Sequence, residues 1–296
     1  MATLRQPVFD TSPMAVRRAR PEDAPACGRI CYEAFTKIST QHAFPPDFPS
    51  VEVATGVLSR MFAHPGFYCV VAESDGQILG SNCLDERSAI AGVGPITIDP
   101  GVQNKGIGRA LMEAVLARSA ERGCQGTRLL QAAFHSRSLS LYTKLGFDTR
   151  EPISAMQGSP IKGPTPGYSV RPARTSDFEE CNRLCRSVHG HDRSGELRDA
   201  IEQRTAVVAE REGRIAAYAT VIGFFGHMVG ESNADVQALI ANADAFVGPG
   251  ILVPTRNATL FRWCLVNGLR VMQPLTLMTV GYYNEPAGAY LPSILY

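Results

Sequence analysis

The stretch Val102-Gln-Asn-Lys-Gly-Ile-Gly-Arg-Ala-Leu-Met112 lies between a short apolar run and a helical pattern. Upstream, Val93-Gly-Pro-Ile-Thr-Ile98 is rich in β-branched residues and is followed by the turn sequence Asp-Pro-Gly, which predicts a strand that ends in a turn. Downstream, apolar residues recur at spacings of three and four from Ile107 to Val115, and Gly123 ends the pattern. The sequence therefore predicts a strand, a glycine loop and a helix in this order.

The start of this helix is suited to an anion. The N–H groups of a first helical turn have no intrahelical partner, and the helix dipole adds partial positive charge there. Gly106 and Gly108 lack a Cβ and let a phosphate approach the backbone, while Lys105 and Arg109 add full positive charge. We therefore expect a phosphate compound at this loop. The alternative is a glycine-tolerant connection whose lysine and arginine are merely solvated.

The spacing of the glycines excludes two common phosphate loops. A dinucleotide fingerprint G-x-G-x-x-G that starts at Gly106 needs a third glycine where Leu111 stands. A nucleoside-triphosphate loop that starts at Gly101 needs Lys and then Ser or Thr at positions 107 and 108, which are Ile and Gly. The pattern that remains, Q-x-x-G-x-G over Gln103–Gly108, resembles the acyl-CoA pyrophosphate loop of the GNAT superfamily of N-acetyltransferases.

The flanking segments extend this resemblance. A second strand-like run, Thr127–Phe134, is followed by Tyr142-Thr-Lys-Leu-Gly-Phe147, which is similar to the Tyr-x-Lys-x-Gly-Phe-like motif of GNAT enzymes. His135 stands where the family often has Asn. Upstream there are helical patterns at 21–36 and 50–63 and two strand-like runs joined by Asp-Gly, a strong hairpin turn. The resulting order, β-α-α-β-β-β-α-β-α, is that of the family.

The pattern of the first half returns in the second half. Val16–Cys31 reappears as Val170–Cys185 at a shift of 154, Val70–Ile78 as Val207–Ile215 at a shift of 137, and Pro152–Met156 as Pro274–Met278 at a shift of 122. The chain therefore reads as a tandem repeat of one fold.

We expect an α/β protein of two tandem GNAT-like domains, each a mixed, mostly antiparallel sheet flanked by helices. Residues 1–156 form the predicted catalytic domain, the Gly- and Pro-rich residues 157–167 the linker, and residues 168–296 a degenerate second domain.

The second copy has lost the segment that corresponds to the glycine loop. Its shift relative to the first copy falls by 15 residues, from 137 to 122, across this interval, and no Q-x-x-G-x-G occurs after residue 167. Glu231 and Asp235 stand where a phosphate would need donors, and a carboxylate at a helix start repels a phosphate. The position that matches Tyr142 is Cys264. We expect this copy to bind no CoA and to be structural or to help form the wall of the substrate site.

Composition argues against several classes of function. With 45% hydrophobic residues and a net charge of +1, the chain offers no electrostatic case for nucleic acid or an anionic membrane. No apolar run approaches the roughly 20 residues that a membrane span needs, and residues 1–10 lack a signal-peptide core. We therefore expect a cytoplasmic protein.

The eight cysteines form no C-x-x-C pair, and we expect them to be free and reduced. Cys27/Cys31 and Cys181/Cys185 are spaced by four residues on predicted helices, without histidine at ligand spacing, so packing is favoured over a metal site. His189 and His191 have no third ligand at a sensible spacing. We expect no metal.

The resemblance implies acetyl-CoA as cosubstrate and direct attack of a neutral amine on the thioester. Tyr142 matches the general acid of the family by position; the alternative is a core aromatic. His135 would contact the acyl-CoA arm. Gly94 to Ile98 would pair through the backbone with the pantetheine. The residues implied to bind acetyl-CoA are Ile96, Thr97, Ile98, Gln103, Asn104, Lys105, Gly106, Ile107, Gly108, Arg109 and His135.

The acceptor side is less defined. Asp85, Glu86 and Glu33 lie where the family places substrate-side groups, but each is also explained as a solvated carboxylate, so the general base stays unassigned. His42 and His64 lie in the region that shapes acceptor pockets in the superfamily, and each is also explained as a loop or capping residue.

We expect transfer of an acetyl group to an amine of a small molecule, in a chain that is compatible with a homodimer. The alternative from another class is a non-catalytic sensor or interaction protein that binds acyl-CoA. The aromatic-rich C-terminal run from Gly281 either lines an acceptor pocket or forms an edge strand, and we favour the strand.

Overall fold

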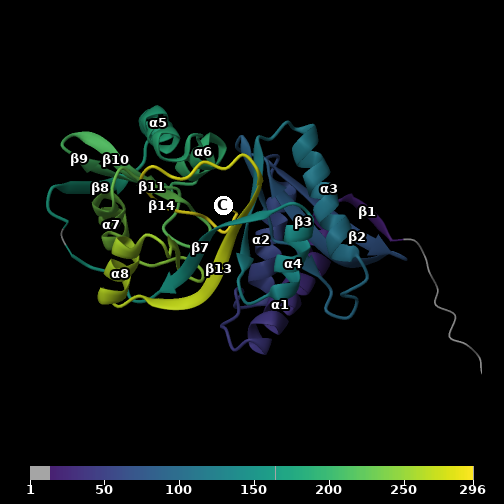
Figure 1. Cartoon of the computed structure of the whole chain (residues 1–296). Coiled ribbons are helices and arrows are strands. Elements are labelled where there is room, and N and C mark those ends of the chain that lie inside the picture. Colours follow the sequence, from purple (N-terminus) through teal and green to yellow (C-terminus); the bar gives the residue numbers. More distant parts are fainter. Residues whose placement is uncertain (1–13, 164, 296) are drawn as a thin grey trace, which may run out of the picture.

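The computed structural model describes residues 14–163 and 165–295, and Figure 1 shows the helices of each half around a central region crossed by two long strands. The first ten residues, which bear on the expected lack of a signal peptide, lie outside the described part.

The first half has the expected order of elements. Its strands and helices are β1 (Ala15–Arg18), the 3₁₀ turn η1 (Pro21–Asp23), α1 (Ala24–Gln41), α2 (Val51–Ala63), β2 (Phe67–Ser74), β3 (Gln77–Asp85), β4 (Ile90–Val93), β5 (Thr97–Ile98), α3 (Ile107–Glu121), β6 (Gly126–Ala132), α4 (Ser136–Lys144) and β7 (Asp148–Gln157).

The second half repeats this order in a shorter form. Its elements are β8 (Tyr168–Pro172), η2 (Thr175–Asp177), α5 (Phe178–His189), α6 (Ser194–Glu202), β9 (Val207–Arg211), β10 (Arg214–Ala219), β11 (Met228–Gly230), α7 (Asn233–Ala241), β12 (Ile251–Pro254), α8 (Ala258–Val266), β13 (Arg270–Gly281) and β14 (Ala289–Leu291).

An ion-pair cluster occurs once in each copy. In the first, Arg17 on β1 pairs with Asp23 at 2.8 Å and with Glu73 on β2 at 2.7 Å. In the second, Arg171 pairs with Asp177 at 2.7 Å and also with Glu210. Arg17 and Asp23 match Arg171 and Asp177 at the shift of 154, and Glu73 matches Glu210 at the shift of 137, two of the three shifts read from the sequence. The tandem fold is thus confirmed down to individual side chains.

The two copies exchange one strand each. The larger sheet has the order β1-β2-β3-β4-β6-β13-β7-β12, with β5 paired to β3. Strand β13 of the second copy lies between β6 and β7 of the first, in register from Leu275↔Ala132 to Gly281↔Gly126 on one side. Strand β7 of the first copy pairs in turn with β12 of the second. In Figure 1, β7 and β13 run side by side through the middle of the molecule. One continuous sheet therefore joins the halves.

The smaller sheet has the order β14-β11-β10-β9-β8. Strand β14 lies at its edge beside β11, so the expected C-terminal edge strand is present, and Ile294 and Leu295 of the same run also line a cavity. Only Glu231 and Ser232 separate β11 from α7, where the first copy has residues 94–106 with β5 and the glycine loop. This is the loss that the falling shift predicted.

Helices cover both faces of the first sheet. Alternation along β2 directs Val70 and Ala72 into a core with α3 and α4, and Cys69 and Val71 into a second core with α1 and α2. The glycine loop and Tyr142 belong to the α3–α4 side.

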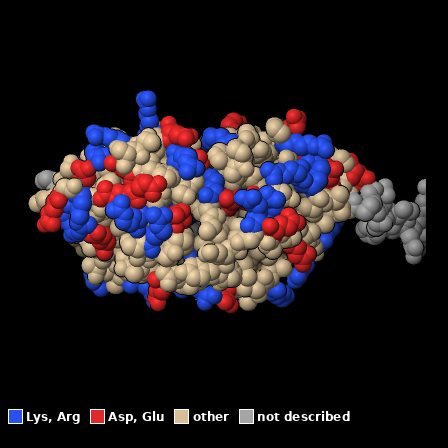
Figure 2. All heavy atoms as spheres, turned by 90° about the horizontal axis from the view of Figure 1, so that it is seen from above, with Lys and Arg blue, Asp and Glu red and all other residues tan. Residues whose placement is uncertain are grey.

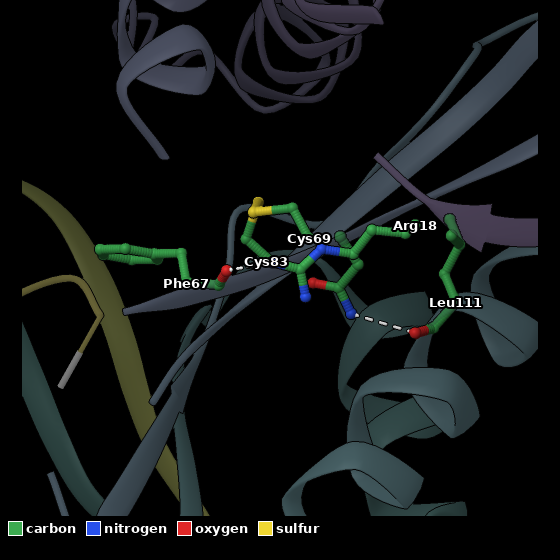
Figure 3. Close-up of a disulfide and its surroundings, with 6 residues drawn as sticks. Arg18, Phe67, Cys69, Cys83 and Leu111 are labelled. Carbon is green, nitrogen blue, oxygen red and sulfur yellow. Dashed lines mark hydrogen bonds between the residues drawn. A yellow bond between two sulfur atoms is a disulfide. The ribbon is translucent and has the colours of Figure 1, made fainter. Parts of the chain in front are cut away.

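The prediction that all cysteines are free was wrong for two of them. Cys69 on β2 and Cys83 on β3 face each other across the hairpin, with Cα atoms 4.0 Å apart, and form a disulfide (Figure 3). The hairpin turns at Asp75-Gly76, where both residues have positive φ, as the Asp-Gly pair predicted. The other six cysteines are free, and Cys27, Cys31, Cys181 and Cys185 are buried in the two cores as expected.

Candidate functional site

A cavity of about 610 Å³ runs from the start of α3 to the loop between α1 and α2. Strands β4 and β6 form one wall, α4 another. The second copy contributes Phe224, Phe225, Leu275, Ile294 and Leu295 to the lining. The second copy therefore helps to form the wall of this cavity, one of the two roles expected for it.

One end of the cavity is the glycine loop. Gly106 is the N-cap of α3 with φ of 82°, and the first helical hydrogen bond runs from the Ala110 N–H to its carbonyl at 3.1 Å. The helix has neither a capping side chain nor an acidic residue in its first turn. A Cβ at Gly106 would meet nothing within 4 Å, so the backbone is open to a ligand. The geometry fits the expected phosphate cradle.

Cations surround this end. Arg109 on α3 lines the cavity and pairs with Glu113 at 3.2 Å. Arg137 on α4, which the sequence analysis did not select, donates to Gln103 at 3.1 Å and also lines the cavity. Together with Lys144 these arginines line an adjoining hollow of about 320 Å³. Lys105 is exposed and lines neither space.

Strands β4 and β6 separate near Gly94, where the pantetheine was expected. Strand β4 pairs in parallel with β6 only from Ile90↔Gly126 to Gly92↔Arg128. After Gly94 the chain turns to pair β5 with β3 instead. Ile96 and Ile98 line the cavity that this separation leaves, together with Gly94. The backbone beyond β4 is thus available to a ligand.

Thr97 takes a different position. Unlike Ile96 and Ile98 on either side of it in the sequence, it is buried and does not line the cavity. Its hydroxyl has no hydrogen-bond partner among the described residues. Of the residues implied to bind acetyl-CoA, Thr97 and Lys105 are outside the lining. Those that the structure brings together around the cavity are Ile96, Ile98, Gln103, Asn104, Gly106, Ile107, Gly108, Arg109 and His135.

His135 precedes α4 and presents an unpaired nitrogen. Its Nε2 is buried and has no hydrogen-bond partner within the described part of the chain. Burial, followed by the nearby charges of Arg137 and His42, lowers the pKa of His135 to about 4. The ring is therefore neutral at pH 7 and can make one hydrogen bond to a ligand in the cavity.

Tyr142 lies on α4 and lines the same cavity with only 7% of its surface exposed. Its ring packs against Phe147 with centroids 6.1 Å apart. Burial raises the pKa of Tyr142 above its usual value. The hydroxyl is therefore protonated at neutral pH and is available as a donor.

The three carboxylates considered as bases are outside the cavity. Asp85 pairs with Arg87 at 2.6 Å, and Glu86 pairs with Arg118 at 2.6 Å. Glu33 is exposed and pairs with Arg29 on its own helix. Their ion pairs account for all three, so each has a structural explanation.

Of the two histidines considered, His42 packs against Phe134 with the two rings tilted by 38°, and its Nδ1 lies 3.0 Å from the Ile38 carbonyl. His64 lies 3.3 Å from Asp199. Neither lines the cavity.

The sequence analysis missed the acidic residue that does line the cavity. Asp47 lies in the loop between α1 and α2, and its Oδ1 accepts a hydrogen bond of 2.7 Å from Gln273 Nε2 on β13. Burial raises the pKa of Asp47 to about 6, partly offset by this hydrogen bond. The run Phe44-Pro-Pro-Asp-Phe48, one charge among apolar residues, is the signal that could have identified it.

The corresponding helix start in the second copy is closed. Asp235 is fully buried at the start of α7 and accepts hydrogen bonds from Tyr168 at 2.8 Å and Ser232 at 2.6 Å. Glu231 pairs with Arg211 and Arg214. Cys264, the counterpart of Tyr142, is buried in the core. At the start of α7, carboxylates thus stand where the first copy has a helix start without an acidic residue.

Within residues 14–163 and 165–295, His, Cys, Asp and Glu nowhere gather in a group of three or more that could hold a metal. In the same part of the chain, each helix is too short or too polar to cross a bilayer. Figure 2 shows positive and negative side chains interspersed over one face of the molecule.

Comparison with known proteins finds a family match within the first half of the chain. Residues 32–147 match the acetyltransferase (GNAT) family. A segment of 63 residues is 40% identical to mycothiol acetyltransferase of Nocardia farcinica; it covers 21% of this chain and 21% of that protein, so the match spans about a fifth of the relative's length.

Two solved structures are similar over nearly the whole chain. One is a candidate acetyltransferase from Pyrococcus horikoshii, with a TM-score of 0.74 and 16% identity, covering 96% of this chain and 97% of that one. The other is a tandem GNAT protein from the clavulanic acid biosynthesis pathway, with a TM-score of 0.53 and 14% identity, covering 91% and 98%. At these identities the likeness concerns the fold.

Proposed function

We propose that this chain, whose residues 32–147 match the GNAT acetyltransferase family, transfers an acetyl group from acetyl-CoA to an amine of a small molecule by direct attack. The observation that carries the proposal is that one cavity has an uncapped helix start at one end, a buried tyrosine in its wall and a carboxylate at the other end.

The phosphate end would bind the pyrophosphate. The N–H groups of Ile107, Gly108 and Arg109 point out of the first turn of α3, and the guanidinium groups of Arg109 and Arg137 supply charge. Gln103 orients Arg137 by accepting its hydrogen bond. These residues hold the cosubstrate and do no chemistry.

The middle of the cavity would hold the pantetheine and the thioester. Backbone groups between Gly94 and Ile98 would pair with the pantetheine amides, and His135 Nε2 would add one hydrogen bond. A backbone N–H aimed at the thioester oxygen stabilises the charge that develops there.

The reaction joins the amine nitrogen to the thioester carbon and breaks the carbon–sulfur bond. Starting from an ammonium ion, two protons leave the nitrogen: one ends on the thiol, and the other reaches solvent. Tyr142 is the proposed donor to the departing thiolate, since it lines the cavity and its hydroxyl carries a proton at neutral pH.

The test is release of free thiol from acetyl-CoA across a panel of primary amines, with the acetylated product identified by mass. Turnover with at least one amine supports the enzyme. Acetyl-CoA binding without transfer to any amine would favour the alternative, a non-catalytic acyl-CoA sensor. The proposal includes a cytoplasmic location and a homodimer, which cell fractionation and the mass in solution test directly.

A further inference from the structure

We propose that Asp47 binds the ammonium group of the acceptor, and that this acceptor is a small amine with one cationic centre on an apolar body. The inference rests on the proposed function, because it names the substrate class for the same cavity.

Asp47 is the only acidic side chain among the described residues that line the cavity. One of its carboxylate oxygens is held by Gln273, a side chain with 2% of its surface exposed. Gln273 follows a register shift at Met272, where β13 has one residue more than its partner β7. Such a bulge re-aims the side chains next to it. The second copy thus fixes the carboxylate of the first.

Within residues 14–163 and 165–295, the charge of Asp47 lacks a partner. The described part of the structure places no Lys, Arg or His within ion-pair distance of it, and Gln273 supplies its one hydrogen bond. Buried carboxylates of this protein do have such partners: Asp85 has Arg87, Glu151 has Arg256, and Asp235 has Arg211 at 3.5 Å.

An unpaired charge in an apolar setting is costly, and a cation that enters the cavity would compensate it. The contrast with the paired carboxylates indicates that the missing partner of Asp47 is a ligand.

The surroundings of Asp47 define the body of that ligand. Apolar side chains from both copies line the cavity: Phe35, Ile38, Phe48, Val57 and Met61 come from the first copy, and Phe224, Phe225 and Leu275 from the second. Phe35 and Phe48 make an edge-to-face contact at 5.6 Å. A second cationic group on the acceptor would be desolvated against this wall without a counter-charge.

One polar group lies on the same wall. The Ser39 hydroxyl near the end of α1 is buried and has no partner among the described residues. Its oxygen can therefore accept a second hydrogen bond from the ammonium group.

The pH dependence follows from the groups around Asp47. Gln273 is neutral, and the Cys31 thiol on α1, whose pKa burial raises above its usual value, is neutral as well. Asp47 has its raised pKa of about 6. As the pH falls through this value the carboxylate takes up a proton and loses its attraction for the ammonium group, so KM for the amine rises.

The experiment compares phenethylamine, an apolar monoamine, with spermidine, a polar polycation, as acceptors for the full-length protein at pH 7.5. We expect kcat/KM for phenethylamine to exceed that for spermidine at least tenfold. Asp47→Asn keeps the shape and removes the charge, so kcat/KM for phenethylamine should fall by roughly 10- to 150-fold, the usual range for a charged hydrogen bond. Gln273→Leu should give a smaller rise in KM with kcat little changed.

Asp244→Asn is the matched control, since it removes the same charge from a side chain that is 97% exposed. The shift in melting temperature with acetyl-CoA should be the same in all variants. Isothermal titration of phenethylamine into the protein saturated with CoA measures acceptor binding independently of turnover.

The possible failures are distinguishable. A preference for spermidine, or full kcat/KM in Asp47→Asn, would overturn the assignment of Asp47 while leaving acetyl transfer standing. Absence of transfer to any amine would instead remove the proposed function. In that case the titration decides about Asp47. If phenethylamine does not bind the wild type, or binds Asp47→Asn equally well, the assignment of Asp47 is wrong too.

Discussion

Replacement of Gly108 by Glu should have opposite effects on the free protein and on ligand binding. A Cβ at Gly108 would lie 3.3 Å from Ile98 Cδ1 and 3.5 Å from Leu141 Cδ2, both ends of flexible side chains. Loss of a helical glycine is worth about 1 kcal/mol, and an acidic residue in the first turn adds about 0.3–1 kcal/mol. At roughly 2–4 °C per kcal/mol, the melting temperature of the free variant should rise by a few degrees.

The same carboxylate lies against the proposed pyrophosphate. A ligand at 100 times its Kd stabilises the wild type by about 2.7 kcal/mol, which corresponds to roughly 5–10 °C. In Gly108→Glu this shift should disappear. Gly108→Ala is the control, because it adds the Cβ without the charge and should keep most of the shift. An undiminished shift with acetyl-CoA in Gly108→Glu would refute the phosphate cradle at α3, since the charge could not then be near the ligand.

Three further outcomes are expected. Tyr142→Phe keeps the buried ring and should lower kcat by roughly 10²–10⁴ with little change in melting temperature or in KM for acetyl-CoA; full turnover would make the tyrosine a core residue only. The folded state lowers the pKa of His135 and keeps its ring neutral, so its contribution to stability is complete above pH 6.5 and is lost as the pH falls toward 4. Between pH 7 and pH 5 the wild type should therefore lose more free energy of unfolding than His135→Asn. Equal losses measured by urea unfolding would contradict this. Residues 1–157 alone lack β13 and should be poorly soluble; a monodisperse monomer in solution would show that this strand is dispensable.

The sequence predicted most of the first copy because its signals are local. The glycine loop, the Asp-Gly turn and the helical spacing after Ile107 each depend on neighbours in the chain, and each was found where expected. The internal repeat was equally visible, since Arg17 and Arg171 recur with their acidic partners at fixed shifts.

The Cys69–Cys83 disulfide was not predicted because of one irregularity in the hairpin. With a regular register about the turn, Ser74↔Gln77 and Glu73↔Ile78, Cys69 would face Asn82. A bulge between Ala72 and Glu73 shifts the pairing by one residue and brings Cys83 opposite Cys69. No composition signal marks a bulge of this kind, so the sequence could not supply the pairing.

Asp47 was not predicted as a site residue for a different reason. Its significance depends on Gln273, which is 226 residues away in the chain and reaches it only because β13 lies in the sheet of the first copy. Strand exchange between similar copies leaves no mark on periodicity or on turn sequences. A contact of this range is therefore beyond pattern analysis, whereas the apolar run around Asp47 was accessible.

The position of β13 also has a consequence for how the chain is made. During synthesis β6 and β7 emerge first, and the strand that belongs between them begins only at Arg270. The intervening residues 158–269 take roughly 6–20 s at ordinary translation rates. Throughout that interval the facing edges of β6 and β7 have unpaired N–H and C=O groups, which are templates for pairing with other chains. The nascent first half is therefore most prone to aggregate before the second half is complete, and its sheet closes only when β13 arrives.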